Sequence, residues 1–327
     1  LLQSSAASDV YKRQVCDRQL RNCEAGLGSK FDGFPHSTGF DIVAASEVMT
    51  IMALAKDMED LRERLRRIVV GYNRSGKPVF ARELNCIGSL CVILKDALKP
   101  NLVQTTEHTP VMIHCGPFGN IAHGCNSVRA TKTALKLAPY VVTEAGFAAD
   151  LGAEKFIHIK CRQAGLNPNA AVLVATIRAL KFHGGVEKEN LGIENIEALR
   201  DGCQNLKTHA ENVRKYGLPV VVAINRFPTD TDEELETVRL FCESIGVDCE
   251  LSEVVARGGD GGTELAKTVK RLVDETPGAP SYLYDLEDNL KTKIEAVARE
   301  IYRADGVDYT EEACLLYTSP SPRDKHR

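Results

Sequence analysis

The sequence of 327 residues contains no tryptophan, no Cys-x-x-Cys pair and no apolar run long enough to span a bilayer. The missing apolar run excludes a transmembrane helix, and the first residues have neither signal-peptide nor transit-peptide character. Its 11 cysteines are irregularly spaced, which fits free thiols in a cytoplasmic protein better than a disulfide framework or a zinc site. A formal net charge of -4 argues against nucleic acid as a partner.

The two ends of the chain, residues 1–14 and 314–327, follow no helix, strand or cap pattern. A DNA sequence that encodes residues 9–14 also encodes residues 314–319 when its reverse complement is read from the second base. Such an inverted repeat resembles translated sequencing adapter, so we expect both tails to be disordered and foreign to the fold. We therefore expect the genuine chain, residues 15–313, to be an internal fragment of a longer protein.

Apolar runs typical of buried strands alternate with amphipathic stretches typical of helices. Strands are expected over residues 111–113, 140–143, 172–176, 219–224 and 248–255, and helices over residues 40–72, 81–97, 128–137, 193–216, 233–245, 263–274 and 286–302. Repeated strand-loop-helix units predict an α/β protein with mainly parallel sheets and flanking helices. We expect one α/β domain over residues 15–187, a second part over 188–303 and the start of a further domain over 304–313.

Residues 172–185 change from an apolar strand into a group of cations. Arg178, Lys181 and His183 follow the strand directly and precede a pair of glycines. Open α/β sheets bind ligands beyond the carboxyl ends of their strands, so this exit is a candidate anion site. The alternative is an ordinary basic turn exposed to solvent.

Three more strand exits carry polar or aromatic residues. Residues 114–127 contain three glycines and two histidines before a helix, which favours an anion site, although a purely structural loop is the alternative. Residues 144–155 lack the Gly-x4-Gly-Lys-Ser/Thr spacing of a phosphate loop. Phe147 in that segment is either a core residue or an exposed stacking face. Residues 225–232 resemble the base-reading loop of nucleotide-binding α/β proteins.

Together these segments resemble one family, the formate–tetrahydrofolate ligases. Residues 174–185 match a family signature residue for residue, and residues 116–127, 143–147, 150–155 and 227–230 are similar to family segments. The resemblance implies a phosphate-loop NTPase-like scaffold and the synthesis of 10-formyltetrahydrofolate. In that reaction ATP phosphorylates formate, and the folate amine attacks the resulting formyl phosphate.

The resemblance also implies roles for individual residues. Cations would neutralise phosphoryl oxygens, an aromatic face would stack on the pterin, and polar groups after the fourth strand would lie between folate and nucleotide. The implied catalytic residues are His123, Arg178 and Lys181, the implied substrate-binding residues are Asn120, Glu144, Phe147, Asp150, His183, Phe227, Pro228 and Val255, and the implied nucleotide-binding residues are Asn225, Thr229 and Asp230. The implied co-substrates are formate, tetrahydrofolate and ATP with Mg²⁺. The resemblance further implies a response to monovalent cations and a homotetramer. We expect no metal ligands from the protein itself.

Several departures from the family pattern limit what the resemblance implies. Val255 stands where the family usually has tryptophan, and residues 35–41 differ from the family's usual Pro-Arg-Glu start. The family's Thr-Pro-x-Gly-Glu-Gly-Lys-Thr phosphate loop and its C-terminal domain are absent, so the chain alone is expected to be inactive. Two other functions stay open: a folate-binding relative without ATP chemistry, and a different phosphate-loop ATPase or kinase on the same scaffold.

Overall fold

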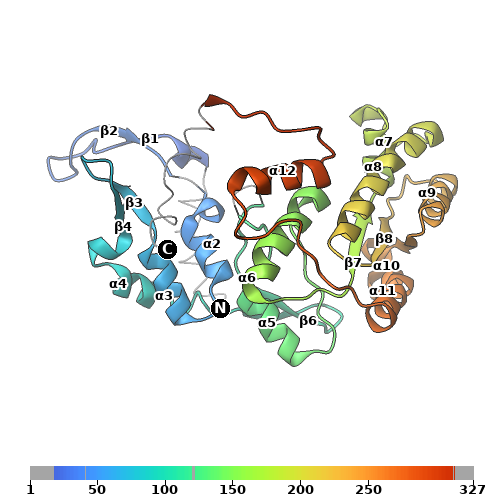
Figure 1. Ribbon diagram of the computed structural model, residues 1–327, viewed down its shortest axis with the longest axis horizontal. Helices are drawn as coiled ribbons and strands as arrows, with labels where there is room; N and C mark the ends of the chain where they lie inside the picture. The colour runs from blue at the N-terminus through green and yellow to red at the C-terminus, as the bar shows by residue number, and fades with distance from the viewer. Residues whose placement is uncertain (1–17, 41, 120–121, 312, 314–327) are drawn as a thin grey trace. The chain divides into compact units, whose positions relative to one another are not determined.

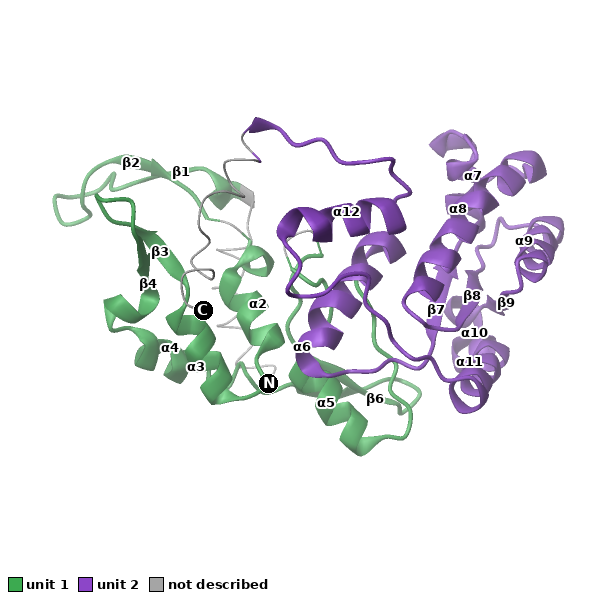
Figure 2. Ribbon diagram, in the orientation of Figure 1, with its two compact units in different colours: residues 1–146 green, residues 147–327 purple. Residues whose placement is uncertain are grey.

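The computed structural model describes residues 18–40, 42–119, 122–311 and 313. The chain forms two compact units, residues 1–146 and 147–327, which Figure 2 shows in green and purple. The domain boundary after residue 187 that we expected from the sequence stays a prediction. Each unit is described by itself below, with the element labels of Figure 1.

Unit 1 combines short helices with two-stranded antiparallel sheets (Figure 1). Its helices are η1 (Arg18–Arg21), η2 (Val43–Ala45), α2 (Glu47–Leu54), α3 (Met58–Arg66), η3 (Ala81–Leu84), α4 (Ile87–Leu94) and α5 (Val128–Leu137). Its strand pairs are β1 (Cys23–Ala25) with β2 (His36–Thr38), β3 (Val69–Tyr72) with β4 (Pro78–Phe80), and β5 (Asn101–Gln104) with β6 (Pro110–Ile113).

Local capping explains why two predicted long helices of unit 1 are each divided. The helix expected over residues 40–72 is wrong as one element, because Asp57 is extended and its carboxylate accepts a hydrogen bond from Asp60 N at 2.9 Å. This N-cap starts α3 separately from α2. The helix expected over residues 81–97 is interrupted at Asn85, whose left-handed backbone, with φ of 52°, ends the turn η3 before α4 begins.

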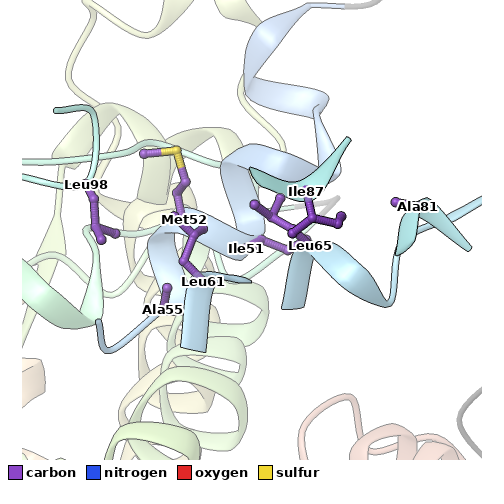
Figure 3. Close-up of a cluster of buried hydrophobic side chains, with 8 residues drawn as sticks. All are labelled: Ile51, Met52, Ala55, Leu61, Leu65, Ala81, Ile87 and Leu98. Carbon is purple, nitrogen blue, oxygen red and sulfur yellow. The ribbon is translucent and has the colours of Figure 1, made fainter. Parts of the chain in front are cut away.

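The core of unit 1 lies where α2, α3 and α4 meet. Figure 3 shows the cluster of buried apolar side chains from these helices and their neighbours: Ile51, Met52, Ala55, Leu61, Leu65, Ala81, Ile87 and Leu98. Leu61 and Leu65 are fully buried and lie one helical turn apart on the same face of α3. The charged residues of α3 lie on its other faces, as the sequence predicted for a solvated, salt-bridged surface.

Unit 1 departs from the parallel α/β pattern that we expected. The strand predicted at residues 111–113 forms, as β6, but it pairs antiparallel with β5 and belongs to no strand-helix-strand unit. The prediction of a strand at residues 140–143 is wrong, because these residues join none of the sheets that the described residues form. The helix α5 has the bounds that the sequence predicted, and Ser127 caps it by accepting a hydrogen bond from Ala130 N.

Unit 2 contains the parallel α/β fold. Its strands β7 (Ala171–Ala175), β8 (Val220–Asn225) and β9 (Asp248–Ser252) form a parallel sheet in that order. Its helices are η4 (Ala148–Ala153), η5 (Phe156–Cys161), α6 (Arg162–Ala164), α7 (Ile177–His183), η6 (Lys188–Asn190), α8 (Ile196–Lys215), α9 (Asp232–Ser244), α10 (Val254–Arg257), η7 (Gly258–Gly262), α11 (Thr263–Glu275) and α12 (Leu290–Glu300).

The central strand of this sheet, β8, is the most deeply buried. Five consecutive residues from Val220 to Ile224 are buried, as expected for a parallel strand covered on both faces. The expected strands at residues 172–176 and 219–224 and the helices at 193–216, 233–245 and 263–274 are confirmed to within a few residues. The strand expected over 248–255 ends earlier, because α10 begins at Val254.

Helices α7 and α8 pack backbone against backbone. A Cβ placed on Gly202 of α8 would lie 1.8 Å from the carbonyl oxygen of Leu180, and one on Gly184 would lie 1.8 Å from the carbonyl oxygen of Ala198. Only glycine permits so close an approach at these two positions. Figure 1 shows the two helices side by side. No helix among the described residues is long and apolar enough to cross a membrane.

Candidate functional site

The cations that follow β7 lie on a helix and not in the loop that the sequence suggested. Thr176 accepts a hydrogen bond from Ala179 N at 3.1 Å and thereby caps α7 directly after β7 ends. Arg178 therefore occupies the first turn of α7, and Lys181 and His183 occupy its last turn. The alternative that we considered, an ordinary basic turn, is wrong because this cap starts a helix at once.

Arg178 contacts the loop that follows β8. Its guanidinium carbon lies 4.7 Å from the centroid of the Phe227 ring, and its Nη2 donates to Thr229 Oγ1 at 3.2 Å. The register pairs Ala175 with Ile224, so the carboxyl ends of β7 and β8 lie side by side. The structure thus brings together three residues that the sequence analysis singled out on two separate segments.

Asp230 completes this cluster. It is buried, and its Oδ2 accepts a hydrogen bond from Phe227 N at 2.7 Å. Burial raises the pKa of the Asp230 carboxyl, and the carboxylate of Glu234 raises it further, against lowering by the backbone donor and by nearby cations. We call Arg178, Phe227, Thr229 and Asp230 the Arg178 cluster.

Two buried polar atoms of the Arg178 cluster have no hydrogen-bond partner in the part of the chain that the structure describes. They are Arg178 Nε, a donor, and Asp230 Oδ1, an acceptor. Buried polar groups in proteins are normally satisfied, so each such atom needs an explanation. A ligand with both an anionic oxygen and a donor group would supply the two missing partners.

Lys181 is bound inside the protein. Its Nζ lies 2.7 Å from Glu234 Oε1 and donates to the carbonyl oxygen of Ile193 at 2.8 Å, and its side chain is 1% exposed. The same carboxylate accepts from Asn195 N at 3.3 Å and, through Oε2, from Thr231 N at 3.1 Å. In this arrangement Lys181 joins α7 to the starts of α8 and α9.

Glu234 is the residue of this region that the sequence analysis missed. From the sequence we expected only a helix over residues 233–245 and assigned Glu234 no role, yet Glu234 is fully buried. One signal was present, since Thr231 and Glu234 have the spacing of a capping box, and both of its hydrogen bonds form. The second function of the carboxylate, binding Lys181, leaves no local pattern in the sequence.

The other predicted site residues of unit 2 lie on exposed or half-buried positions. Asn225 is the last residue of β8, and Pro228 is exposed beside Phe227. Phe147 and Val255 are each 86% exposed, so neither belongs to the core. His183 is exposed at the end of α7. Asp150 lies in η4. Burial and the neighbouring Asp150 carboxylate raise the pKa of Tyr302 to about 12.

The remaining predicted residues belong to unit 1. His123 is fully buried and Glu144 is exposed. Asn120 lies outside the described residues. That these residues meet the Arg178 cluster in one site stays a prediction.

One segment has nearly the spacing of a phosphate loop but a different structure. Residues 71–78 read Gly-Tyr-Asn-Arg-Ser-Gly-Lys-Pro, with Pro78 where a phosphate loop has serine or threonine. They form the hairpin turn between β3 and β4, in which Asn73 Oδ1 accepts from Lys77 N at 3.0 Å. A phosphate loop connects a strand to a helix, so this turn is not one. Among the described residues, no group of three or more His, Cys, Asp or Glu could hold a metal ion.

The parallel sheet of unit 2, with a cation and an aromatic ring meeting at its carboxyl edge, places the protein among the α/β proteins. Residues 8–316 match the model of the formate–tetrahydrofolate ligase family, and the chain belongs to this family. The family is a family of ligases that use ATP, formate and tetrahydrofolate, and membership implies formyltetrahydrofolate synthetase activity. The described residues do not show the phosphate-loop NTPase-like scaffold that we expected.

Proposed function

We propose that this protein ligates formate to tetrahydrofolate, with ATP as energy source, through formyl phosphate. The family match over residues 8–316 carries the proposal. In the first step a formate oxygen takes the γ-phosphoryl group of ATP and ADP leaves. In the second step the folate N10 attacks the formyl carbon, phosphate leaves, and the amine loses its proton. Mg²⁺ enters with ATP as part of that substrate.

Arg178 is the proposed contact to the phosphoryl oxygens. Its guanidinium is held between the Phe227 ring and Thr229, and its buried Nε has a hydrogen bond left to donate. Guanidinium groups match phosphate geometry and keep their charge at all relevant pH values. A fixed cation lowers the energy of the charge that develops on the transferring group. His123 is proposed to add a second donor.

We propose that Lys181 acts indirectly, by holding Arg178 in place. Its amino group binds Glu234 in the interior, and that ion pair fixes α7, which carries Arg178, against the start of α9. The sequence suggested a direct contact with phosphate for Lys181. The buried ion pair supports a positioning role instead, in which Lys181 and Glu234 hold Arg178 and the loop after β8 in one arrangement.

Tetrahydrofolate is proposed to stack on Phe147, with Val255 as an apolar second wall. Both side chains are 86% exposed and free to cover a planar ring. Asn225, Thr229 and Asp230 are proposed to bind the nucleotide beside it, and Asn120, Glu144, Asp150, His183, Phe227 and Pro228 are proposed to line the folate and formyl phosphate site. We also propose that the protein responds to monovalent cations and assembles as a homotetramer.

One observation favours a second candidate, a folate-binding protein without ATP chemistry. The described residues form no phosphate loop, since the only nearly matching spacing that we found, at residues 71–78, is a hairpin turn. The two functions share the folate site and differ in whether ATP is consumed.

The test is phosphate release from ATP by the full-length protein, with formate and tetrahydrofolate added singly and together. The ligase requires both, and Arg178→Ala should abolish release while the fold is retained. The exposed Arg200→Ala on α8 is the control and should leave release unchanged. Release without formate and folate would favour a different ATPase or kinase. Folate binding without any release would favour the second candidate.

A further inference from the structure

An ion pair connects two neighbouring strand exits at the carboxyl edge of the parallel sheet. Arg226 follows β8 directly, and Glu253 follows β9 directly. Arg226 Nη1 lies 3.1 Å from Glu253 Oε1, and Arg226 N donates to the carbonyl oxygen of Ser252 at 3.1 Å. The two side chains are 35% and 23% exposed, so water reaches the pair only in part. The two segments are thus joined where they leave the sheet.

The backbone around Glu253 is closely packed. Glu253 N donates to the carbonyl oxygen of Gly261 at 2.9 Å, and its carbonyl oxygen accepts from Arg257 N at 3.0 Å. A Cβ placed on Gly261 would lie 2.5 Å from that carbonyl oxygen, so glycine lets η7 return to this point. Residues 253–262 therefore form one compact turn. Val255 lies on this turn and is 86% exposed, so fixing Glu253 also fixes the place of Val255.

Arg226 is held on the β8 side as well. Its Nη2 donates to Oδ1 of Asp232, the first residue of α9, at 3.1 Å. The next residue along the chain, Phe227, contacts the Arg178 guanidinium, and Phe227 N donates to Asp230. The Arg226 guanidinium therefore links the segment that carries Phe227, Thr229 and Asp230 to the segment that carries Val255.

A second arginine binds the same carboxylate without connecting the two segments. Arg257 Nη1 lies 3.1 Å from Glu253 Oε2, and both residues belong to the segment after β9. Two guanidinium groups thus share one carboxylate at equal distances. Of the two contacts, the one with Arg226 crosses from one strand exit to the other, whereas the one with Arg257 stays within one segment.

We propose that Arg226 is a positioning residue for the folate step, which acts through Glu253 to hold Val255 in place relative to the loop after β8. The inference rests on the proposed function, in which Val255 covers the pterin and the Arg178 cluster holds nucleotide and phosphoryl groups. Folate N10 must reach the carbon of a formyl phosphate that the other segment binds. A fixed geometry between two reacting groups accelerates their reaction, and the ion pair supplies it.

The test measures phosphate release by the full-length protein, with tetrahydrofolate or ATP varied while the other substrates are saturating. In Arg226→Met the KM for tetrahydrofolate should rise about fivefold, which corresponds to about 1 kcal/mol for a partly exposed ion pair. The KM for ATP should stay unchanged, because the bond from Phe227 N to Asp230 still holds the loop after β8. A loss of stability alone would not change one KM and spare the other.

Arg257→Met is the matched control, since it removes the other guanidinium from Glu253 at the same distance. It should leave both KM values unchanged. Glu253→Gln breaks the contact from its other side and should raise the KM for tetrahydrofolate as Arg226→Met does. The double variant of Arg226→Met with Glu253→Gln should show no further rise, because the two residues act through one contact. Circular dichroism verifies the folding of each variant.

The outcomes separate this inference from the proposed function. An unchanged KM for tetrahydrofolate in Arg226→Met, an equal rise in Arg257→Met, or multiplying effects in the double variant would overturn the inference alone. So would equal rises in the KM values for tetrahydrofolate and ATP. An unmodified protein that releases no phosphate with formate and tetrahydrofolate present would instead contradict the proposed function, and the inference would fail with it.

Discussion

Lys181 Nζ and Glu234 Oε1 are 2.7 Å apart, and the two side chains are 1% and 0% exposed. The pair joins α7, which carries Arg178, to α9. Ion pairs this deeply buried make no large net contribution relative to apolar residues, but removing one partner leaves a buried charge without compensation. The pair therefore makes the position of α7 sensitive to either residue.

Replacing Lys181 by methionine should lower the free energy of unfolding by about 3–5 kcal/mol, because the Glu234 carboxylate stays buried without its cation. The double variant Lys181→Met with Glu234→Leu should recover most of this loss. Urea denaturation followed by circular dichroism measures both. A single variant as stable as the unmodified protein would contradict the prediction.

The exposed pair Lys267–Glu264 of α11 provides the matched control. Its N–O distance is also 2.7 Å, but its side chains are 67% and 68% exposed. Lys267→Ala should change the free energy of unfolding by less than about 1 kcal/mol, since water screens the charge. Equal losses of unfolding free energy in Lys181→Met and Lys267→Ala would mean that burial is not the cause of the destabilisation.

Val255→Trp should tighten tetrahydrofolate binding by about 1 kcal/mol, or roughly fivefold, because an aromatic ring stacks on the pterin where valine only covers it. The chain contains no other tryptophan, so quenching of the new indole fluorescence reports binding directly. Phe147→Ala in the same background should weaken binding by a similar amount.

Leu240→Trp on α9 is the control for the fluorescence measurement. Leu240 is 50% exposed and lies on a helix that we assign no folate contact. Its indole should respond to tetrahydrofolate little or not at all. An equal response from both indoles, or an unchanged affinity in Val255→Trp, would remove Val255 from the pterin site.

Much of unit 2 could be predicted because its signals are local. The unbroken apolar run of β8 and the amphipathic α8 each determine their own structure. In unit 1 the segments are short, and the pairing of β5 with β6 depends on tertiary contacts that no local pattern encodes. The split between α2 and α3 also depended on one capping carboxylate at Asp57.

The candidate site shows the same limit. Arg178, Phe227, Thr229 and Asp230 were all identified from strand exits, and the register of β7 with β8 brings them together. The burial of Lys181 was not predicted, because the local sequence around a buried lysine does not differ from that around an exposed one. Only the packing of α7 on α8 and the ion pair with Glu234 of α9 distinguish them.

Acidification below about pH 6.5 should destabilise unit 1 through His114. Burial lowers the pKa of His114, although a hydrogen bond to the carbonyl oxygen of Ala97 opposes this. The unfolded chain therefore binds a proton that the folded state rejects, and stability falls as the pH drops from the unfolded pKa through the lower folded one. Urea denaturation at a series of pH values from about 7.5 to about 5 measures the slope.

His114→Gln should reduce that slope, even if the variant is less stable at pH 7, because its side chain does not titrate. The exposed His36→Gln should leave the slope as it is. His209 in unit 2, whose pKa is also lowered by burial, is expected to contribute separately. An unchanged slope in the His114 variant would contradict the prediction.

Gly202→Ala should destabilise the protein by about 1–3 kcal/mol, because its Cβ would overlap the carbonyl oxygen of Leu180 and force α7 and α8 apart. Gly88→Ala in α4 is the matched control, since nothing lies within 4 Å of its Cβ. There alanine should stabilise by about 0.5–1 kcal/mol through its higher helix propensity. Thermal unfolding of both variants measures the difference, and stabilisation by Gly202→Ala would contradict it.

The contact between α7 and α8 has a mechanical consequence. With Gly184 against Ala198 and Gly202 against Leu180, the two backbones touch at two points, so neither helix can roll on the other without a steric clash. Helix α8, with 20 residues, and helix α7, with seven, then move as one rigid body. Arg178 lies near the N-terminal end of α7. A displacement of α8 would therefore displace α7 and the Arg178 guanidinium by nearly the same distance.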